Sequence, residues 1–424
     1  MKKSQFHLLK TKRFLPLFIT FFLGAANDNF FRNAMVILIL YRLTEHAESI
    51  GKLFVTLAAG IFILPFFLFS ATAGQIADKY EKSGVIRRIK LAEIAIMLLG
   101  AAGLIIGDAY FLLFVLFLMG AQSSFFGPIK YSILPLHLRQ DELISGNALM
   151  ASGTFVAILF GTIAGTLIIL WQGGVWVVSA GVLITATAGW LGSQYIPETE
   201  PTNTELRVNY NLVSATWEIM RLATKSKPVF LSVIGISWFW VVGATLLGQF
   251  PNLVKFTYHA NNEVVTLFLA ASTLGIATGS LICNRLLRGE ISARYVALSA
   301  CGVSLFLIDL WLAAPEATDY AGDYLNIGEF LASGPGYRTV FDIFAVSACG
   351  GMYTVPLYAI LQSRANVGER SRIVAANNVL NALFMVISSL TATAMLANDA
   401  TVPEIFLAVS FANLFFIVLF WRVR

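Results

Sequence analysis

Long runs of apolar residues recur through most of this sequence, and they constrain its fold more than any other feature. Residues 14–41, 53–72, 110–126 and 406–421 are clear examples. Each run approaches or exceeds the roughly 20 residues that a helix needs to cross the hydrocarbon core of a bilayer. Hydrophobic residues make up 57% of the chain and charged residues only 12%, whereas charged residues form about a quarter of a soluble domain. The sequence therefore predicts an all-α membrane protein.

Breaks in hydropathy predict twelve transmembrane helices in two six-helix bundles, residues 1–196 and 228–424, joined by a polar cytoplasmic linker at 197–227. The linker has two interpretations. It forms an amphipathic helix at the membrane surface with Leu212, Ala215, Trp217 and Met220 on its apolar side, or it is a loosely packed tether. The predicted helices begin near Phe14, Lys52, Ile89, Tyr110, Leu143, Val175, Val229, Val264, Tyr295, Val340, Ile373 and Phe406.

The basic residues are distributed unevenly between the two sets of loops. Most of the 29 Lys and Arg residues fall in one set and at the two termini, whereas the opposite loops contain only Arg42, Lys52, Lys255 and Arg338. Loops rich in Lys and Arg stay on the cytoplasmic side of a membrane. We therefore expect both termini in the cytoplasm. The basic residues are spread over many short loops rather than one face, so no nucleic-acid partner is indicated.

The two halves resemble each other in sequence, as expected for transporters that alternate between two conformations. The loop beginning at Gly74 and ending at Lys79 corresponds to the one from Ser280 to Arg285. Asn147 in the fifth predicted span corresponds to Asn377 in the eleventh. The repeat predicts a pseudo-symmetric pair of bundles.

A polar string interrupts the first predicted span. Ionisable side chains at membrane depth are costly and usually face a bundle interior or a water-filled cavity. Asp28 and Arg32 are four residues apart, so we expect them on one face and close enough to pair. They form either a headgroup site with a coupling ion at Asp28 or a structural ion pair. The predicted substrate-binding residues of this string are Asn27, Asp28, Asn29, Arg32 and Asn33.

Other polar residues within predicted spans extend this set. Lys130 lies between two prolines and either holds an anionic group or reaches the inner surface. Asn147 of the fifth span is also predicted to bind substrate. So are Gln249, Asn377 and Asn381, because they lie in spans that mirror the first and fifth. We interpret Glu93, Gln122, Asp309 and Asp342 as residues that join helices by hydrogen bonds.

The loop between the second and third spans contains Gly74, Asp78 and Lys79, followed by Arg87 and Arg88. This pattern is similar to the GxxxD(R/K) signature of major facilitator transporters. Glycine permits a close helix approach, and a carboxylate can cap or bridge a neighbouring helix end in one conformation. We therefore predict that these five residues form a gate.

The sequence argues against an enzyme. It contains no GxxxxGK(S/T) phosphate-binding string. His137 and Asp141 are one residue too close for the HxxxxD spacing of glycerolipid acyltransferases. The cysteines and histidines are scattered, so neither a metal site nor a resident cofactor is expected.

Four blocks resemble bacterial lysophospholipid transporters of the major facilitator type. They begin at Phe14, Phe125, Ser237 and Met352, and include the strings GAANDNFFRNA, GPIKYSILP and AANNVLNALFMV. The resemblance implies a major facilitator fold and transport of lysophospholipids such as lysophosphatidylethanolamine across the bacterial inner membrane by alternating access. A separate acyltransferase would then reacylate the cargo.

The chain departs from this family after its GNAL string, where Met150, Ala151 and Ser152 replace an expected acidic residue. The alternatives are an exporter of amphiphilic drugs or other small solutes and a membrane scaffold that recruits an acyltransferase, since a fold does not determine a cargo. The sequence leaves open whether a proton, a sodium ion or no ion drives transport.

Overall fold

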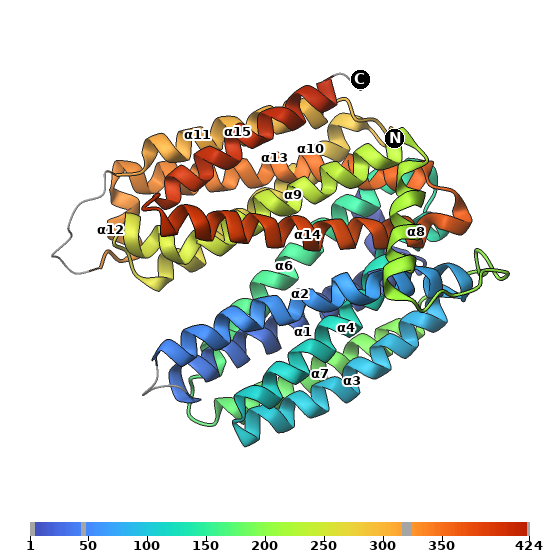
Figure 1. The fold of residues 1–424 in the computed structure, drawn as a ribbon, viewed down its shortest axis with the longest axis horizontal. Helices are drawn as coiled ribbons and strands as arrows, with labels where there is room; N and C mark the ends of the chain where they lie inside the picture. The colour runs from blue at the N-terminus through green and yellow to red at the C-terminus, as the bar shows by residue number, and fades with distance from the viewer. Residues whose placement is uncertain (1–4, 44–47, 316–323, 422–424) are drawn as a thin grey trace.

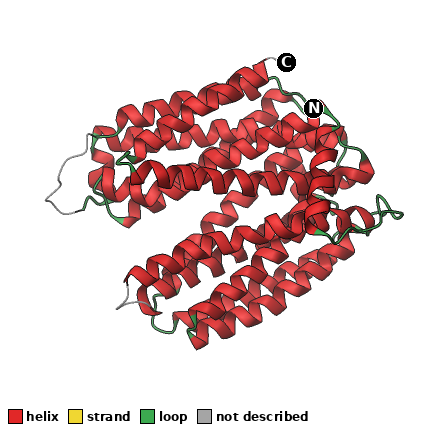
Figure 2. Ribbon diagram, in the orientation of Figure 1, coloured by secondary structure: helices red, strands yellow, loops and turns green. Residues whose placement is uncertain are grey.

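Twelve long helices run between two opposite ends of the molecule in the computed structural model, which describes residues 5–43, 48–315 and 324–421 (Figures 1 and 2). These residues contain no β-strand, only an isolated bridge between Ala260 and Leu325. The long helices are α1 (Leu15–Leu38), α2 (Glu48–Lys79), α3 (Lys82–Ile106), α4 (Ala109–Ser132), α6 (Leu143–Ile168), α7 (Gly174–Gln194), α9 (Lys227–Asn252), α10 (Asn262–Leu287), α11 (Val296–Ala313), α13 (Gly334–Arg364), α14 (Arg370–Ala397) and α15 (Val402–Trp421).

Shorter helical segments connect or extend these spans. They are η1 (Gln5–Lys10), η2 (Ile39–Leu43), α5 (Leu134–His137), η3 (Gln140–Glu142), α8 (Leu212–Thr224), η4 (Leu253–Thr257), α12 (Ile327–Ala332) and η5 (Val367–Glu369). Helix α8 lies in the predicted linker and buries Ala215 and Ile219 while Trp217 is exposed. The amphipathic helix, one of the two interpretations of this segment, is therefore present.

The prediction of a twelve-helix, all-α membrane protein is confirmed. Within the described ranges, eleven helices are long and apolar enough to cross a membrane. The twelfth is α1, which is 24 residues long but contains the polar string around Asp28. The largest error in the predicted starts is at α3, which begins at Lys82 rather than near Ile89.

Local sequence signals fix both ends of α3. The Glu81 carboxylate caps α3 by accepting from the backbone amides of Ser83 and Gly84. Burial alone would raise the pKa of Glu81, but these hydrogen bonds and one from Thr199 lower it below its ordinary value. Gly107 ends α3 with a φ of 73°, a left-handed conformation that glycine adopts without strain.

Glycines allow α6 to pack directly against the backbone of α1. A Cβ atom on Gly161 would lie 2.3 Å from the carbonyl oxygen of Ala26, and one on Gly165 would lie 2.4 Å from that of Phe30. Both distances are too short for a carbon atom, so these positions require glycine. This contact is typical of small-residue packing between membrane helices, and it fixes the position of the polar string on α1.

The long helices form two groups, α1 to α7 and α9 to α15 (Figure 1). The groups meet at the end of the molecule that carries α8, here called the closed end, and diverge toward the end that carries α12, here called the open end. Helix α7 ends at Gln194 and α9 begins at Lys227. The exact domain bounds at residues 196 and 228 stay predictions.

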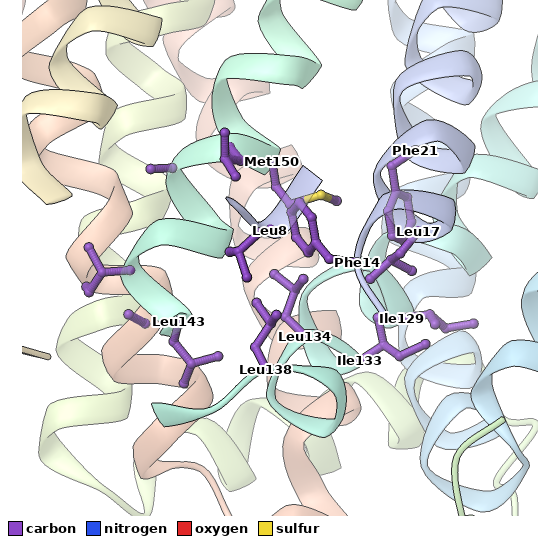
Figure 3. Packing of buried hydrophobic residues seen from close by; sticks show 14 of the residues in the cluster. Leu8, Phe14, Leu17, Phe21, Ile129, Ile133, Leu134, Leu138, Leu143 and Met150 are labelled. Atoms are coloured by element: carbon purple, nitrogen blue, oxygen red, sulfur yellow. The ribbon is translucent and has the colours of Figure 1, made fainter. Parts of the chain in front are cut away.

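A hydrophobic cluster joins the two groups at the closed end. Phe14, Ile129 and Leu143 of the first group share it with Leu287 and Val355 of the second. Figure 3 shows the part contributed by the first group. Because one apolar core spans both groups, they are packed together at this end.

Burial along α14 shows where the contact between the groups stops. Every residue from 370 to 382 except Asn378 is buried. Beyond this point, up to residue 397, only Ala392 is buried. Helix α14 is thus covered on all sides at the closed end and largely uncovered toward the open end. The structure is an open-ended conformation with one sealed side.

Candidate functional site

The polar string of α1 forms the centre of the candidate site, but its two charges do not pair with each other. The Asp28 carboxylate accepts from the hydroxyl of Ser123 on α4 at 2.7 Å. Arg32 donates to the side-chain oxygen of Asn29 at 2.9 Å, and its guanidinium lies 5.5 Å from the ring centre of Phe62. Among the described residues, no ion pair joins Asp28 to Arg32, so the predicted pairing is wrong.

The physical reason is competition from neighbouring helices. Ser123 offers Asp28 a short hydrogen bond, and the ring of Phe62 offers the Arg32 cation an aromatic face. Both charged side chains remain half-buried. They are therefore available to groups of opposite charge, whereas a closed ion pair would neutralise itself.

A hydrogen-bonded charge network lies behind Asp28. The carboxylate of Glu93 accepts from Asn27 at 3.0 Å and from Gln122 at 3.2 Å, and it forms an ion pair with Lys90. The Ser123 hydroxyl lies 3.1 Å from the Gln122 side-chain oxygen, which connects this network to Asp28. We name Lys90, Glu93, Asn27, Gln122 and Ser123 the α1–α3–α4 network.

Lys90 is fully buried in a space provided by two glycines. A Cβ atom on Gly189 would lie 2.9 Å from the Lys90 ammonium nitrogen, and one on Gly24 would lie 3.2 Å from it. Lys90 directly follows the predicted start of the third span near Ile89, and no role was predicted for it. The signal that it belongs to the membrane interior was its spacing of three residues from Glu93, which places the two on one helix face.

The asparagines of the string have different environments. Asn27 is fully buried and donates to Glu93, so it belongs to the interior of the first group and not to an accessible surface. Asn29 is 9% exposed and holds Arg32. Asn33 is half-buried and donates to the Thr162 hydroxyl of α6 at 3.2 Å. Only Asn33 shares the partial exposure of Asp28 and Arg32.

Lys130 lies on α4 toward the closed end. It donates to the Thr154 hydroxyl of α6 at 2.6 Å, and its nitrogen lies 5.3 Å from the ring centre of Tyr131. The Tyr131 ring stacks on Tyr358 of the second group with 3.9 Å between ring centres. Lys130 is half-buried and has no ion pair among the described residues, so its charge is available to an anionic group.

The second group contributes neutral polar side chains. With its amide in the orientation that satisfies its neighbours, Asn381 accepts from Trp240 at 3.3 Å and from Asn377 at 3.1 Å, and donates to Ser237 at 2.8 Å. Gln249 is half-buried near the other end of α9 and accepts from Asn252 at 2.9 Å. The structure brings Asn377 and Asn381 together and leaves Gln249 apart from them.

Asn147 does not lie on an accessible surface. Its amide exchanges two hydrogen bonds with Gln362 of α13, at 2.7 and 2.9 Å, and both side chains are buried. This pair crosses between the two groups. Asn147 was predicted to bind substrate; the structure instead places it in the contact that seals the closed end.

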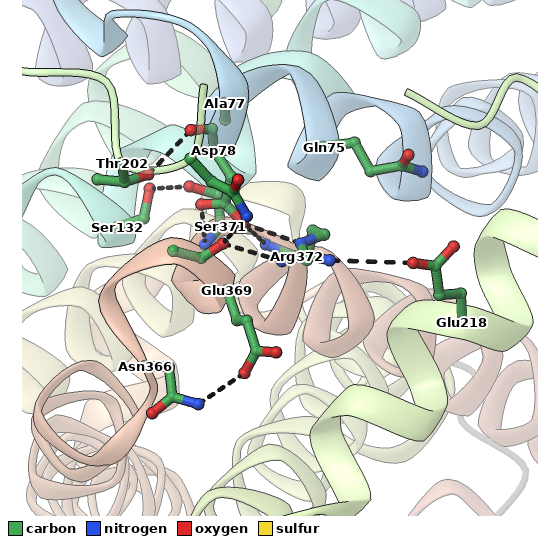
Figure 4. A network of polar contacts seen from close by, with 12 residues as sticks. Gln75, Ala77, Asp78, Ser132, Thr202, Glu218, Asn366, Glu369, Ser371 and Arg372 are labelled. Atoms are coloured by element: carbon green, nitrogen blue, oxygen red, sulfur yellow. Dashed lines mark hydrogen bonds and ion pairs between the residues drawn. The ribbon is translucent and has the colours of Figure 1, made fainter. Parts of the chain in front are cut away.

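Asp78 forms the centre of that seal (Figure 4). One carboxylate oxygen accepts from the backbone amide of Ser371 at 2.9 Å. The other accepts from the amide of Arg372 at 3.2 Å and from its guanidinium at 3.3 Å. Asp78 of the first group therefore caps the N-terminus of α14 in the second, where the helix dipole favours a negative charge.

Gly74 lies one helical turn before Asp78 and faces the same helix. A Cβ atom on Gly74 would lie 2.7 Å from the Cβ atom of Ala375 and 2.9 Å from the Ser371 carbonyl oxygen. Any larger residue would push α2 away from α14. The contact between the groups at this point depends on the glycine.

The three basic residues predicted for the gate lie elsewhere. Lys79 lies over the ring of Tyr80, Arg87 donates to Glu198 of the linker at 3.3 Å, and Arg88 is exposed. Their place beside Asp78 is taken by Arg372 and by Lys82, whose nitrogen lies 3.9 Å from the carboxylate. Neither residue was predicted for the gate: Arg372 is almost 300 residues from Asp78 along the chain, and Lys82 lies outside the GxxxD(R/K) pattern.

Metal ligation is not indicated at this site. Among the described residues, no group of three His, Cys, Asp or Glu side chains is arranged to hold a metal ion. The chemistry that the site offers is recognition of charge: one carboxylate, one guanidinium and one ammonium group, each partly accessible.

Curated relatives share most of the chain. The lysophospholipid transporter LplT of Escherichia coli O7:K1 is 25% identical over 361 residues, which cover 84% of this chain and 82% of the relative. LplT of Shigella boydii serotype 4 gives the same identity and coverage. The similarity agrees with the resemblance found in the four sequence blocks.

Solved structures share the fold at low identity. The fucose:proton symporter FucP of E. coli matches with a TM-score of 0.71 at 13% identity, over 96% of this chain and 97% of that one. The human organic anion transporter MFSD10 matches with a TM-score of 0.73 at 12% identity, over 96% and 99% of the two chains.

The family model described as Major Facilitator Superfamily matches residues 17–389, which is most of the chain. The twelve-helix architecture of the protein and the proteins similar to it agree with this match. The protein therefore belongs to the Major Facilitator Superfamily and is a multi-pass membrane transporter rather than an enzyme.

Proposed function

We propose that the protein flips lysophospholipids, such as lysophosphatidylethanolamine, across the bacterial inner membrane by alternating access. One observation carries this proposal: Asp28 and Arg32 lie near the middle of a membrane-spanning helix, half-buried and not paired with each other. Unpaired charges at membrane depth are retained where a charged cargo meets them. The similarity to LplT over 84% of the chain supports a lysophospholipid as that cargo.

The charges suit a zwitterionic headgroup. Arg32 and Lys130 are cations that can bind a phosphate, and Asp28 is an anion that can bind an ammonium group. The network behind Asp28 supports its position through Ser123. In this proposal Asn33 adds a neutral hydrogen-bonding group on the same helix.

An apolar crevice suits the single acyl chain. A cavity of 320 Å³ lies between α9, α14 and α15, where Val241, Phe384, Met395 and Val409 are among the lining residues. An engineered apolar cavity of about 150 Å³ stays dry and binds benzene, so this crevice has room for several methylene groups. The tail then needs no passage through water.

The closed end would face the cytoplasm in this proposal. The loops rich in Lys and Arg and the linker helix α8 lie at that end, as the charge distribution predicts for the cytoplasmic side. Alternating access would then require the Asp78 cap on α14 to open. A separate acyltransferase would reacylate the delivered cargo on the cytoplasmic side.

The test is a flipping assay with purified protein in liposomes. Fluorescent lysophosphatidylethanolamine in the outer leaflet should become protected from a membrane-impermeant quencher, and Asp28→Asn and Arg32→Gln should slow this protection. Arg88→Gln, which changes an exposed cation, is the matched control. Wild-type protein that moves no lysophospholipid, while cells that overproduce it gain resistance to amphiphilic drugs, would establish a drug exporter instead.

A further inference from the structure

The second group of helices buries a carboxylate near the open end. Asp342 lies on α13 and is 0% exposed. Neither of its carboxylate oxygens has a hydrogen-bond partner in the part of the chain that the structure describes. An ionised carboxylate is strongly disfavoured in such a place, because nothing replaces the water that it loses.

Among the described residues, none of the charged and titratable groups around Asp342 forms an ion pair with it. Asp309 of α11, Arg338 of α13 and Tyr258, the residue after η4, face it. Arg338 is committed to Asp309, with one bond of 3.0 Å and a second short contact. The Tyr258 hydroxyl is bonded to that of Thr339. Helices α10 and α12 also pack on α13, and they contribute the apolar rings of Phe268 and Phe330.

Glu93 shows what a buried ionised carboxylate requires in this same protein. It is 1% exposed, pairs with Lys90 and accepts from two amides. Asp342 is equally buried and has none of these partners. A proton on Asp342 removes the difference, because a neutral carboxyl group loses little on burial and its hydroxyl can donate to the Asp309 carboxylate.

We propose that Asp342 is a proton-binding site, filled in this conformation and reached from the open end through Asp309. The side chains of Asp309 and Arg338 are 34% and 42% exposed, so they connect the buried carboxyl group to water. On release, the O–H bond of Asp342 breaks, the Asp309 carboxylate accepts the proton, and water at the open end takes it from there. The site supplies a coupling ion to the transporter, which goes beyond the proposed cargo.

Infrared spectroscopy of the purified wild-type protein tests protonation without any cargo. We expect the carbonyl-stretch band of a protonated carboxylic acid at neutral pH. The Asp342→Asn variant, which has the shape of the neutral acid, should lack this band. Asp399→Asn is the matched control, because Asp399 is an exposed aspartate in the loop between α14 and α15; it should keep the band.

A wild-type spectrum without this band, or one that Asp342→Asn leaves unchanged, would overturn the proposal. If Asp342→Asn does not fold, Asp342→Glu decides the question, because a longer acid should shift the same band. A band that stays in place in Asp342→Glu would equally reject the site.

Flipping assays at several external pH values test the coupling. The wild-type rate should change with pH by up to about tenfold per unit, the limit for a single proton, whereas Asp342→Asn should be insensitive to pH. Equal pH dependence in both proteins would reject coupling through Asp342. If the wild type moves no lysophospholipid at all, the proposed cargo is wrong, and the infrared result still decides the proton site.

Discussion

The two halves of this transporter treat buried polar groups in opposite ways. In the first half, Asp28 is connected through Ser123 and Gln122 to the ion pair of Glu93 and Lys90. In the second half, the neutral amides of Asn377 and Asn381 on α14 bond to each other. The difference teaches that a pseudo-symmetric scaffold can place the charges of the α1 site and its supporting network in one half only. This arrangement suits a cargo with one charged end and one apolar end.

Packing shows the same asymmetry. Phe30 of α1 fills the space between α6 and α7, where a Cβ atom on Gly181 would lie 2.6 Å from its ring. The corresponding space between α9, α14 and α15 is the 320 Å³ crevice. Gly243 and Gly248 of α9 have open space beside them. The first half is closed around its charges, and the second half leaves room for an apolar chain.

The largest expected effect comes from breaking the ion pair of the first half. Lys90→Met leaves the Glu93 charge buried without its partner, so we expect the free energy of unfolding to fall by about 3–5 kcal/mol. Thermal unfolding in detergent measures this loss. The double variant Lys90→Met with Glu93→Leu should recover most of it, because an apolar pair replaces the charges. A double variant as unstable as the single one would contradict this account of the network.

Asp28→Asn should affect transport more than stability. It keeps the shape of the side chain and removes the charge, which contributes about 1.5–3 kcal/mol to a hydrogen bond with a charged partner. We therefore expect flipping of lysophosphatidylethanolamine to slow by about 10- to 100-fold. Asn381→Ala in the second half removes only neutral hydrogen bonds and should slow flipping less. Equal losses in both halves would remove the distinction between them.

Asp78→Asn tests the contact between the halves. The variant weakens the cap on α14, at a cost of about 1–3 kcal/mol, and should increase the population in which the closed end opens. When the closed end opens, the two groups should approach each other at the opposite end. Spin labels at Leu57 of α2 and Leu390 of α14, which lie toward the open end, should then report a larger fraction of short label-to-label distances. Lys79→Gln changes a neighbouring residue outside the seal and should leave the distances as in wild type. The same shift in both variants would argue against a gate at Asp78.

The smallest expected effect concerns two equivalent loops. Glu81 caps α3 after the loop from α2, whereas the matching loop after α10 begins with Arg288 at a φ of 52°. Glu81→Gln should lower stability by about 0.5–2 kcal/mol. Because the pKa of Glu81 is lowered in the folded protein, the wild-type advantage should be present at neutral pH and disappear as the pH falls through that lowered value. A difference that grows in acid would contradict this sign.

Hydropathy was sufficient to predict the twelve helices, because each span must be apolar to cross a membrane. It misplaced the start of α3 because the first two turns of this helix contain Lys82, Arg87 and Arg88, whose low hydropathy is typical of a loop. The polar string of α1 was identified for a general reason, the cost of charge at membrane depth.

Contacts between residues far apart along the chain could not be predicted from the sequence. The i, i+4 spacing of Asp28 and Arg32 predicted a pair, but in the structure Asp28 contacts Ser123 and Arg32 contacts Phe62, both on other helices. Asn147 was assigned to substrate because of its repeat position, and its true partner, Gln362, lies in the other half. The sequence also offered no sign that Asp342 lacks a partner, since this depends on Arg338 being held by Asp309.

The most direct measurement of the central claim is photocrosslinking with two lysophospholipid analogues, one reactive in the headgroup and one near the end of the acyl chain. Mass spectrometry of the labelled protein would locate each reaction. We predict that the headgroup probe labels α1 and α4 of the first half, and that the acyl probe labels the α9, α14 and α15 crevice. Headgroup labelling of the second half, or equal labelling of both, would contradict the account.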